Sequence, residues 1–170
     1  EAEYFNKNEF LNNFSIKKNN DKINFISESF DISSHIEKSL KGTKKNNFFD
    51  IFANLNSSLE INIKLAKLDN EHNFNNLKGK ARIRSNKIDK ANFYARFDDQ
   101  NVFSYTKNNI NGKKITTIFS DLAKPFVKKF NFIKGFEDGK LDFTSKQLSK
   151  NLSKSELRIY DFKLQDMPAL

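Results

Sequence analysis

The feature that most constrains this chain is a series of segments in which apolar and polar residues alternate. The clearest runs over residues 59–65, where leucine or isoleucine occupies every second position. A period of two places successive side chains on opposite faces of a β-strand. Weaker alternation follows at residues 78–84, 91–97, 102–106 and 114–119, with short polar turns between the segments. One-faced strands that follow each other closely predict an antiparallel meander.

The last third of the chain predicts a short helix followed by a hairpin. Apolar residues at helical spacing would form one stripe of a helix that begins near Asp121, with Pro125 in its first turn. Gly135 then ends this helix, and residues 140–144 and 157–160 alternate as two further strands. The stripe consists of Leu122, Phe126, Val127, Phe130 and Ile133.

The first third is less regular. A pair of strands is expected around the turn at residues 19–21, within residues 16–26. Ile32, Ile36 and Leu40 are spaced four apart after Asp31, a good N-cap, which predicts a first short helix. The apolar run at residues 48–52 fits either a helix or a strand. We therefore expect one β-dominated α+β domain over residues 1–170, an antiparallel meander of about seven to nine strands with one apolar face, plus two short amphipathic helices.

Composition excludes several kinds of protein. The chain has 170 residues, a net charge of +9 and no cysteine, so neither disulfides nor thiolate chemistry nor a Cys-based zinc site is available. The basic residues are spread along the sequence, which favours a solvated lysine surface over a dedicated site for polyanions. No run approaches the ~18 apolar residues that a membrane-spanning helix needs.

Residues that could carry catalysis are few and have structural explanations. His35 and His72 lie far apart without ligands at metal-binding spacing, so surface or hydrogen-bonded histidines are expected. Asp98 and Asp99 fall between two strands, which is typical of turn chemistry, and Asp161 follows a strand. We expect no enzyme activity, no cofactor and no metal.

The apolar face of such a meander must be covered by helices, by a second sheet or by a ligand. Two short helices are too small to cover the whole face, so an incompletely covered surface is a candidate binding groove. Taken alone, the residues favour an ordinary closed core over a groove. The groove candidates are Leu59, Ile61, Ile63, Leu65, Ile83, Phe93, Phe97, Leu141, Phe143, Leu157 and Ile159, and the candidates for a covering helix are Leu122, Phe126 and Phe130.

Several closing motifs resemble the AsmA-like superfamily of bacterial envelope proteins, YhdP-type. The similarity lies in the segments 120–126 and 136–143, and in ELRIYDFKLQDMPAL at residues 156–170. Two upstream segments, residues 29–32 and 76–81, resemble the helix entry and a Gly-containing strand of that family. The motifs consist of small and apolar residues, so the resemblance concerns architecture more than chemistry.

This resemblance implies a β-rich trough in the Gram-negative periplasm, of which the chain would be a fragment next to adjacent repeats of the same protein. An inner-membrane anchor outside the fragment and non-enzymatic transport of phospholipid or another acyl lipid towards the outer membrane are then expected. On that basis Ile61→Asp or Phe93→Asp should weaken lipid binding without unfolding the chain. A structural or protein-interaction module without lipid is the alternative. A weaker alternative is a basic binder of single-stranded nucleic acid, in which Tyr94, Phe103 and Tyr105 would stack on bases beside Arg96. We favour the interpretations without nucleic acid and expect no nucleic-acid partner.

Overall fold

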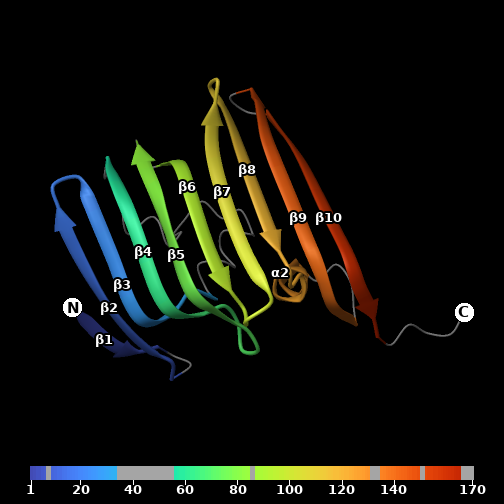
Figure 1. Cartoon of the computed structure of the whole chain (residues 1–170), viewed down its shortest axis with the longest axis horizontal. Helices are drawn as coiled ribbons and strands as arrows, with labels where there is room; N and C mark the ends of the chain where they lie inside the picture. The colour runs from blue at the N-terminus through green and yellow to red at the C-terminus, as the bar shows by residue number, and fades with distance from the viewer. Residues whose placement is uncertain (7–8, 34–55, 85–86, 131–134, 150–151, 166–170) are drawn as a thin grey trace, which may run out of the picture.

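The computed structural model describes residues 1–6, 9–33, 56–84, 87–130, 135–149 and 152–165. These residues form one open sheet whose ten strands lie side by side in the order of the sequence, from β1 at one edge to β10 at the other (Figure 1). The strands are β1 (Ala2–Phe5), β2 (Leu11–Asn19), β3 (Lys22–Asp31), β4 (Ser57–Lys67), β5 (Asn73–Arg84), β6 (Lys87–Arg96), β7 (Val102–Ile110), β8 (Lys113–Ser120), β9 (Phe136–Ser149) and β10 (Leu152–Leu164). The β-dominated class is confirmed, with more strands than the sequence predicted.

The sheet is mixed, which corrects the expected all-antiparallel meander. Every neighbouring pair of strands is antiparallel except β3 and β4, which run parallel with Ile23 opposite Leu59 and Phe25 opposite Ile61. The sheet is therefore two antiparallel meanders, β1–β3 and β4–β10, joined side by side at one parallel pair.

The turns between strands use residues that tolerate a positive φ. At the β7–β8 hairpin, Asn111 and Gly112 have φ of 52° and 76°, the combination that a two-residue type I′ turn requires. Asn20, with φ of 53°, lies in the β2–β3 turn, so the predicted strand pair around this position is confirmed. These tight turns fix the register of the strands on either side.

One helix occurs among the described residues, α2 (Lys124–Phe130), and its start differs from the prediction. Pro125 does lie in its first turn, where a missing N–H costs nothing. Asp121 does not begin the helix, because its carboxylate accepts a hydrogen bond from the Val102 N–H (3.1 Å) at the start of β7. The sheet thus uses the carboxylate that the sequence assigned to the helix.

The other predicted helix falls mostly on residues 34–55, outside the described residues, as do His35 and the apolar run at 48–52. Asp31, the predicted N-cap of this helix, is described: it is the last residue of β3, and its carboxylate accepts a hydrogen bond from the Ser33 N–H (2.9 Å). This is the bond expected of an N-cap. Within the described part of the chain, no helix is both long and apolar enough to cross a bilayer.

The hydrophobic core lies on one face of the sheet, which we call the core face. Along β4 the buried side chains occupy every second position through Leu59, Ile61 and Ile63. The phase then changes, so that Leu65 is only half-buried while Ala66 and Leu68 are buried. The same change occurs beside it in β3, where Ser27 and then Phe30 are buried, so the phase changes at the same level in both paired strands.

Candidate functional site

The strand register aligns the core-face side chains into rows that run across the sheet. One row, which we call the central row, takes one residue from each strand from β2 to β10. At the usual spacing of about 4.8 Å between strands it is about 38 Å long. Its members are Ile16, Phe25, Ile61, Gly79, Phe93, Tyr105, Ile118, Phe143 and Leu157. The row contains no charged side chain.

Gly79 does not interrupt this apolar surface. A Cβ atom built on Gly79 would lie 2.3 Å from Cδ1 of Phe93 and 2.3 Å from the carbonyl oxygen of Asn92. The ring of Phe93, the next residue in the row, therefore occupies the space that a side chain at Gly79 would need. The aromatic ring covers the glycine backbone and keeps the row continuous.

Burial varies along the central row, which has a packed middle and more accessible ends. In β3, β4 and β6, Phe25, Ile61 and Phe93 are at most 7% exposed, so this part is a packed core. From β7 onward the side chains are half-buried, and Leu157 on the edge strand β10 is 45% exposed. At the other end, Ile16 on β2 is 43% exposed, but it is a single residue, and the longer accessible part of the row lies on β7–β10.

The structure brings nine of the eleven groove candidates into or against a single hydrophobic cluster. Phe97, Phe143 and Ile159 pack against it, and the buried members are Leu59, Ile61, Ile63, Ile83, Phe93 and Leu141. Leu65 is half-buried outside this cluster, and Leu157 is exposed. A groove floored by β4 is not open, because its candidate residues are buried; the accessible surface lies further towards β10.

Helix α2 covers part of the core face at one end of β7–β9. The rings of Phe126 and Phe103 stack with centroids 5.6 Å apart, and Ala123 and Val127 are buried beside them. Leu122 is half-buried and precedes the helix, and the side chain of Phe130 lies outside the described part. Phe126 therefore covers the face as predicted, over a small area.

A strip of polar residues borders the accessible part of the central row, and sequence reasoning missed it. The next row along the strands is apolar from β3 to β6, but from β7 to β10 it reads Lys107, Thr116, Ser145 and Ser155. The row beyond adds Asn109 and Lys114, which lie opposite each other. The signal was present in the sequence, because Lys107 has the same phase as Phe103 and Tyr105.

Lys107 is in an unusual environment for a cation. Burial lowers its pKa below the ordinary lysine value, and repulsion from Lys114 lowers it further, while Asp89 acts in the opposite direction. The carboxylate of Asp89 is already bonded to the guanidinium of Arg82, with Nε at 2.9 Å. Lys107 and Lys114 thus place two positive charges on the core face next to apolar side chains.

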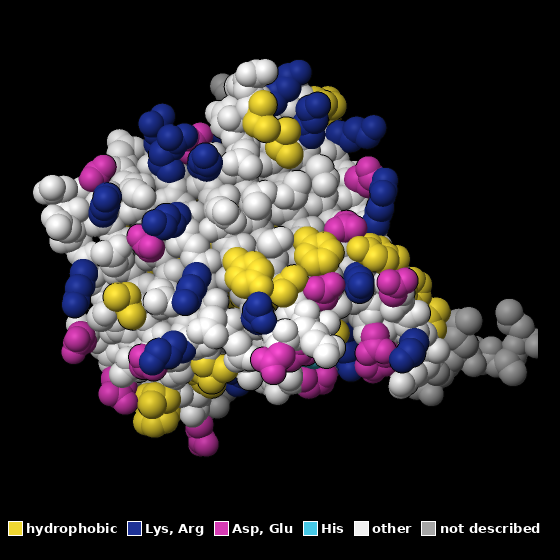
Figure 2. Space-filling model, in the orientation of Figure 1, with side chains coloured by type: hydrophobic (Ala, Val, Ile, Leu, Met, Phe, Trp, Pro, Cys, Tyr) yellow, Lys and Arg dark blue, Asp and Glu magenta, His cyan; other side chains and the backbone are white. Residues whose placement is uncertain are grey.

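The opposite face of the sheet is polar and mixed in charge. Lys and Arg side chains are interspersed there with Asp and Glu, and hydrophobic side chains form a band from the middle of the face towards the β10 side (Figure 2). Lys64 pairs with Glu28 at 2.7 Å and Lys80 with Glu60 at 3.3 Å, all well exposed. Exposed pairs of this kind contribute at most about 1 kcal/mol each. This face is the solvated surface that the composition predicted.

The four residues proposed from the sequence to bind nucleic-acid bases do not all lie on one face of the sheet. The register places Phe103 and Tyr105 on the core face, beside Ala95 and Phe93, while Tyr94 lies opposite Ser104 on the polar face. Arg96 follows in the phase of Tyr94, and its Nη1 donates to the carbonyl oxygen of Asp99 (3.1 Å). Bases could therefore not stack on all three rings at once.

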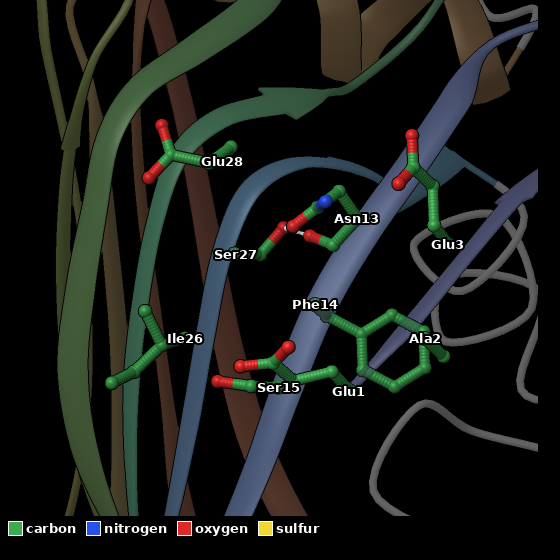
Figure 3. Close-up of a pocket in the computed structure, with 9 residues that line it drawn as sticks. All are labelled: Glu1, Ala2, Glu3, Asn13, Phe14, Ser15, Ile26, Ser27 and Glu28. Carbon is green, nitrogen blue, oxygen red and sulfur yellow. Dashed lines mark hydrogen bonds between the residues drawn. The ribbon is translucent and has the colours of Figure 1, made fainter.

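Two hollows occur elsewhere, and neither has a catalytic arrangement. One, of about 440 Å³, lies at the β1 edge, where Ser27 Oγ donates to the carbonyl oxygen of Asn13 (2.6 Å) and the carboxylates of Glu1, Glu3 and Glu28 do not converge (Figure 3). The other, of about 490 Å³, is lined by residues that include Arg82 and the buried Ser57, whose hydroxyl has no hydrogen-bond partner among the described residues.

The remaining chemistry-bearing residues serve turns. His72 Nδ1 lies 2.9 Å from Asp69 Oδ1 within the β4–β5 turn. Asp98 accepts hydrogen bonds from the backbone N–H groups of Gln100 and Asn101 (2.8 and 2.7 Å) after β6. Asp161 is the exception: it has a φ of 55° and lies within β10, so the expectation that it follows a strand was wrong. Among the described residues, no group of three or more His, Asp or Glu side chains could hold a metal ion.

Comparison with known proteins gives no relative. No protein-family model matches the chain, no curated protein matches it, and no solved structure matches its fold.

Proposed function

We propose that this chain is a non-enzymatic lipid-binding segment whose accessible apolar row on β7–β10 contacts acyl chains. The observation that carries the proposal is the central row, which crosses nine strands without a charged side chain and becomes accessible towards Leu157. The accessible part on β7–β10 spans three strand spacings, about 14 Å, which is enough to contact part of one acyl chain. Side chains exposed in this way on the same face as a core are suited to an apolar ligand.

Binding of this kind needs no chemistry. Each CH₂ group buried against apolar side chains gains about 0.8 kcal/mol relative to water, which is close to what it gains in a bilayer. An acyl chain could therefore pass between membrane and protein with little change in free energy, while its polar head group stays hydrated. A residue that holds the head group strongly would slow release, so transport favours weak contacts along a continuous row.

The resemblance to AsmA-like envelope proteins supports the same proposal. In that setting the chain would be one part of a longer periplasmic sheet, anchored in the inner membrane, that conducts phospholipid to the outer membrane. The two open edges of the sheet would then be joined to adjacent repeats of the same protein.

The test is binding of an NBD-labelled phosphatidylcholine, followed by fluorescence. Leu157→Asp places a carboxylate in the accessible part of the row and should weaken binding at least about tenfold, which corresponds to about 1.4 kcal/mol. The matched control is Tyr160→Asp on the same strand, because Tyr160 is similarly exposed, at 37%, and lies on the polar face. The control should change binding less than about twofold. Equal effects of both variants, or no binding by the unmodified chain, would refute the proposal.

The edge strand β10 favours a second candidate, an interaction module. Among the described residues, β10 pairs with β9 alone over 13 residues, which leaves its outer edge available for another strand. Its core-face residues Ser153, Ser155, Leu157 and Ile159 include no charge that would discourage pairing. Concentration-dependent self-association in light scattering, abolished by Ile159→Lys without lipid being present, would favour this function over lipid binding.

A further inference from the structure

The accessible part of the central row and the polar strip beside it form one amphipathic surface. Ile118 on β8 and Phe143 on β9 belong to the apolar row, and two residues along the same strands stand Thr116 and Ser145. Two residues of a strand span about 6.6 Å. The surface thus changes from apolar to polar over the distance that separates the first carbons of an acyl chain from its head group.

The polar strip carries positive charge at the place where a head group would lie. Lys107 faces Thr116 across the β7–β8 pair, and Lys114 faces Asn109 one row further. Both lysines are half-buried on the core face. Asp89, whose carboxylate favours the charged form of Lys107, also forms an ion pair with Arg82. This one carboxylate therefore does not neutralise both ammonium groups.

This arrangement costs the free protein stability and would be relieved by an anion. Two lysine side chains on one face repel each other, and partial burial removes part of their hydration. The lowered pKa of Lys107 reflects both effects, with burial the larger. An oxyanion between the two ammonium groups would replace the lost hydration and cancel the repulsion, and the hydroxyl of Thr116 could donate a further hydrogen bond.

We propose that the ligand of this surface is an amphiphile with an anionic head group, held by Lys107 and Lys114, with its acyl chain lying along Ile118, Phe143 and Leu157. The proposal rests on the proposed lipid-binding function and adds the charge of the substrate. A fatty-acid carboxylate and the phosphodiester of an anionic phospholipid share this chemistry.

The experiment compares ligands that have the same tail and different head groups. Oleate, monoolein and oleoyl-lysophosphatidylglycerol are titrated into the whole chain by calorimetry below their critical micelle concentrations. We expect oleate or the lysophospholipid to bind at least about tenfold more tightly than neutral monoolein, and this preference should shrink as salt rises. The tighter of the two anionic ligands identifies whether a carboxylate or a phosphodiester is preferred.

The variants separate the head-group site from general electrostatics. Lys107→Gln/Lys114→Gln should reduce the anionic ligands to the affinity of monoolein and leave monoolein unchanged. The control Lys113→Gln/Lys146→Gln removes the same charge from the exposed polar face and should keep the preference. If monoolein binds the unmodified chain as tightly as both anionic ligands, or if both double variants lose equal affinity, this inference is overturned and the proposed function still stands. Failure of monoolein as well as both anions to bind would refute the proposed function itself.

Discussion

Two leucines on the core face, Leu59 and Leu157, allow the division between packed core and accessible surface to be measured. Leu59 is 0% exposed between Ile23 and Ala81 of its row, whereas Leu157 is 45% exposed at the β10 edge. The same substitution, leucine to alanine, removes the same atoms at both positions. Any difference in the free energy of unfolding therefore comes from the surroundings.

The expected magnitudes follow from these exposures. Leu59→Ala loses about 2.5 kcal/mol of transfer free energy and leaves a cavity among packed neighbours, for a total of about 3–5 kcal/mol. Leu157→Ala loses about half of the transfer contribution and leaves no enclosed cavity, so about 1 kcal/mol is expected. With an m-value of about 2 kcal/mol per M, the urea midpoint falls by about 1.5–2.5 M for Leu59→Ala and about 0.5 M for Leu157→Ala.

The assay is equilibrium urea unfolding followed by far-UV circular dichroism, since the chain has no tryptophan to report by fluorescence. A cost below about 1 kcal/mol for Leu59→Ala would mean that the middle of the core face is not packed. Similar costs for the two variants would mean that the β10 end is as closed as the centre. The first result would refute the division of the core face into a packed middle and an accessible end. The second would remove the accessible apolar surface on which the functional proposals depend.

Three further predictions use the same measurement of stability. Gly79→Ala should cost about 1–3 kcal/mol because its Cβ overlaps the ring of Phe93, and a cost within about 0.5 kcal/mol would show that the ring does not cover the glycine. Lys107→Met should raise the melting temperature of the free protein, because it removes a half-buried charge whose pKa is lowered by burial and by repulsion; a fall would contradict this. Hydrogen bonds from the Asn101 side chain and backbone hold the pKa of Asp98 below 3.8, so its stabilising effect is present above pH ~4 and lost as the pH falls through the lowered pKa. The urea midpoints of the unmodified chain and Asp98→Asn should therefore differ at neutral pH and converge only as the pH falls below about 4.

The burial of the core face changes which substitutions can test lipid binding. Ile61 and Phe93 were expected to accept aspartate without unfolding, but they are 4% and 7% exposed. An aspartate there would bury a carboxylate without a partner, a change that commonly costs several kcal/mol. Leu157 is the suitable position because it belongs to the same row and remains accessible.

Local patterns predicted much of the sheet. Alternation at residues 59–65 and 91–97 identified β4 and β6 and the face that each buries, because side-chain direction in a strand depends only on position along it. The phase change after Ile63 was not predictable, since it is shared with β3, a strand whose pairing with β4 the sequence did not reveal. The parallel β3–β4 pair was missed because strand orientation is fixed by contacts between residues distant in sequence.

The candidate site was predicted in part for a related reason. Apolar residues such as Phe143 and Leu157 were recognised from their alternation. Lys107 and Thr116 were not singled out, because charge and polarity usually indicate exposure. Their phase relative to Tyr105 and Ile118 places them on the core face. Only the strand register shows that they meet beside the apolar row.

The single parallel pair has a consequence for how this sheet forms. Within β1–β3 and within β4–β10, each strand pairs with the next one along the chain. Apart from the β8–β9 connection, which contains α2, these contacts close short loops and can form early. Joining β3 to β4 closes a much longer loop, with Ile23 opposite Leu59. We therefore expect the two meanders to fold as separate units and the seam between them to form last, so that substitutions at Ile23 mainly accelerate unfolding and leave the folding rate little changed.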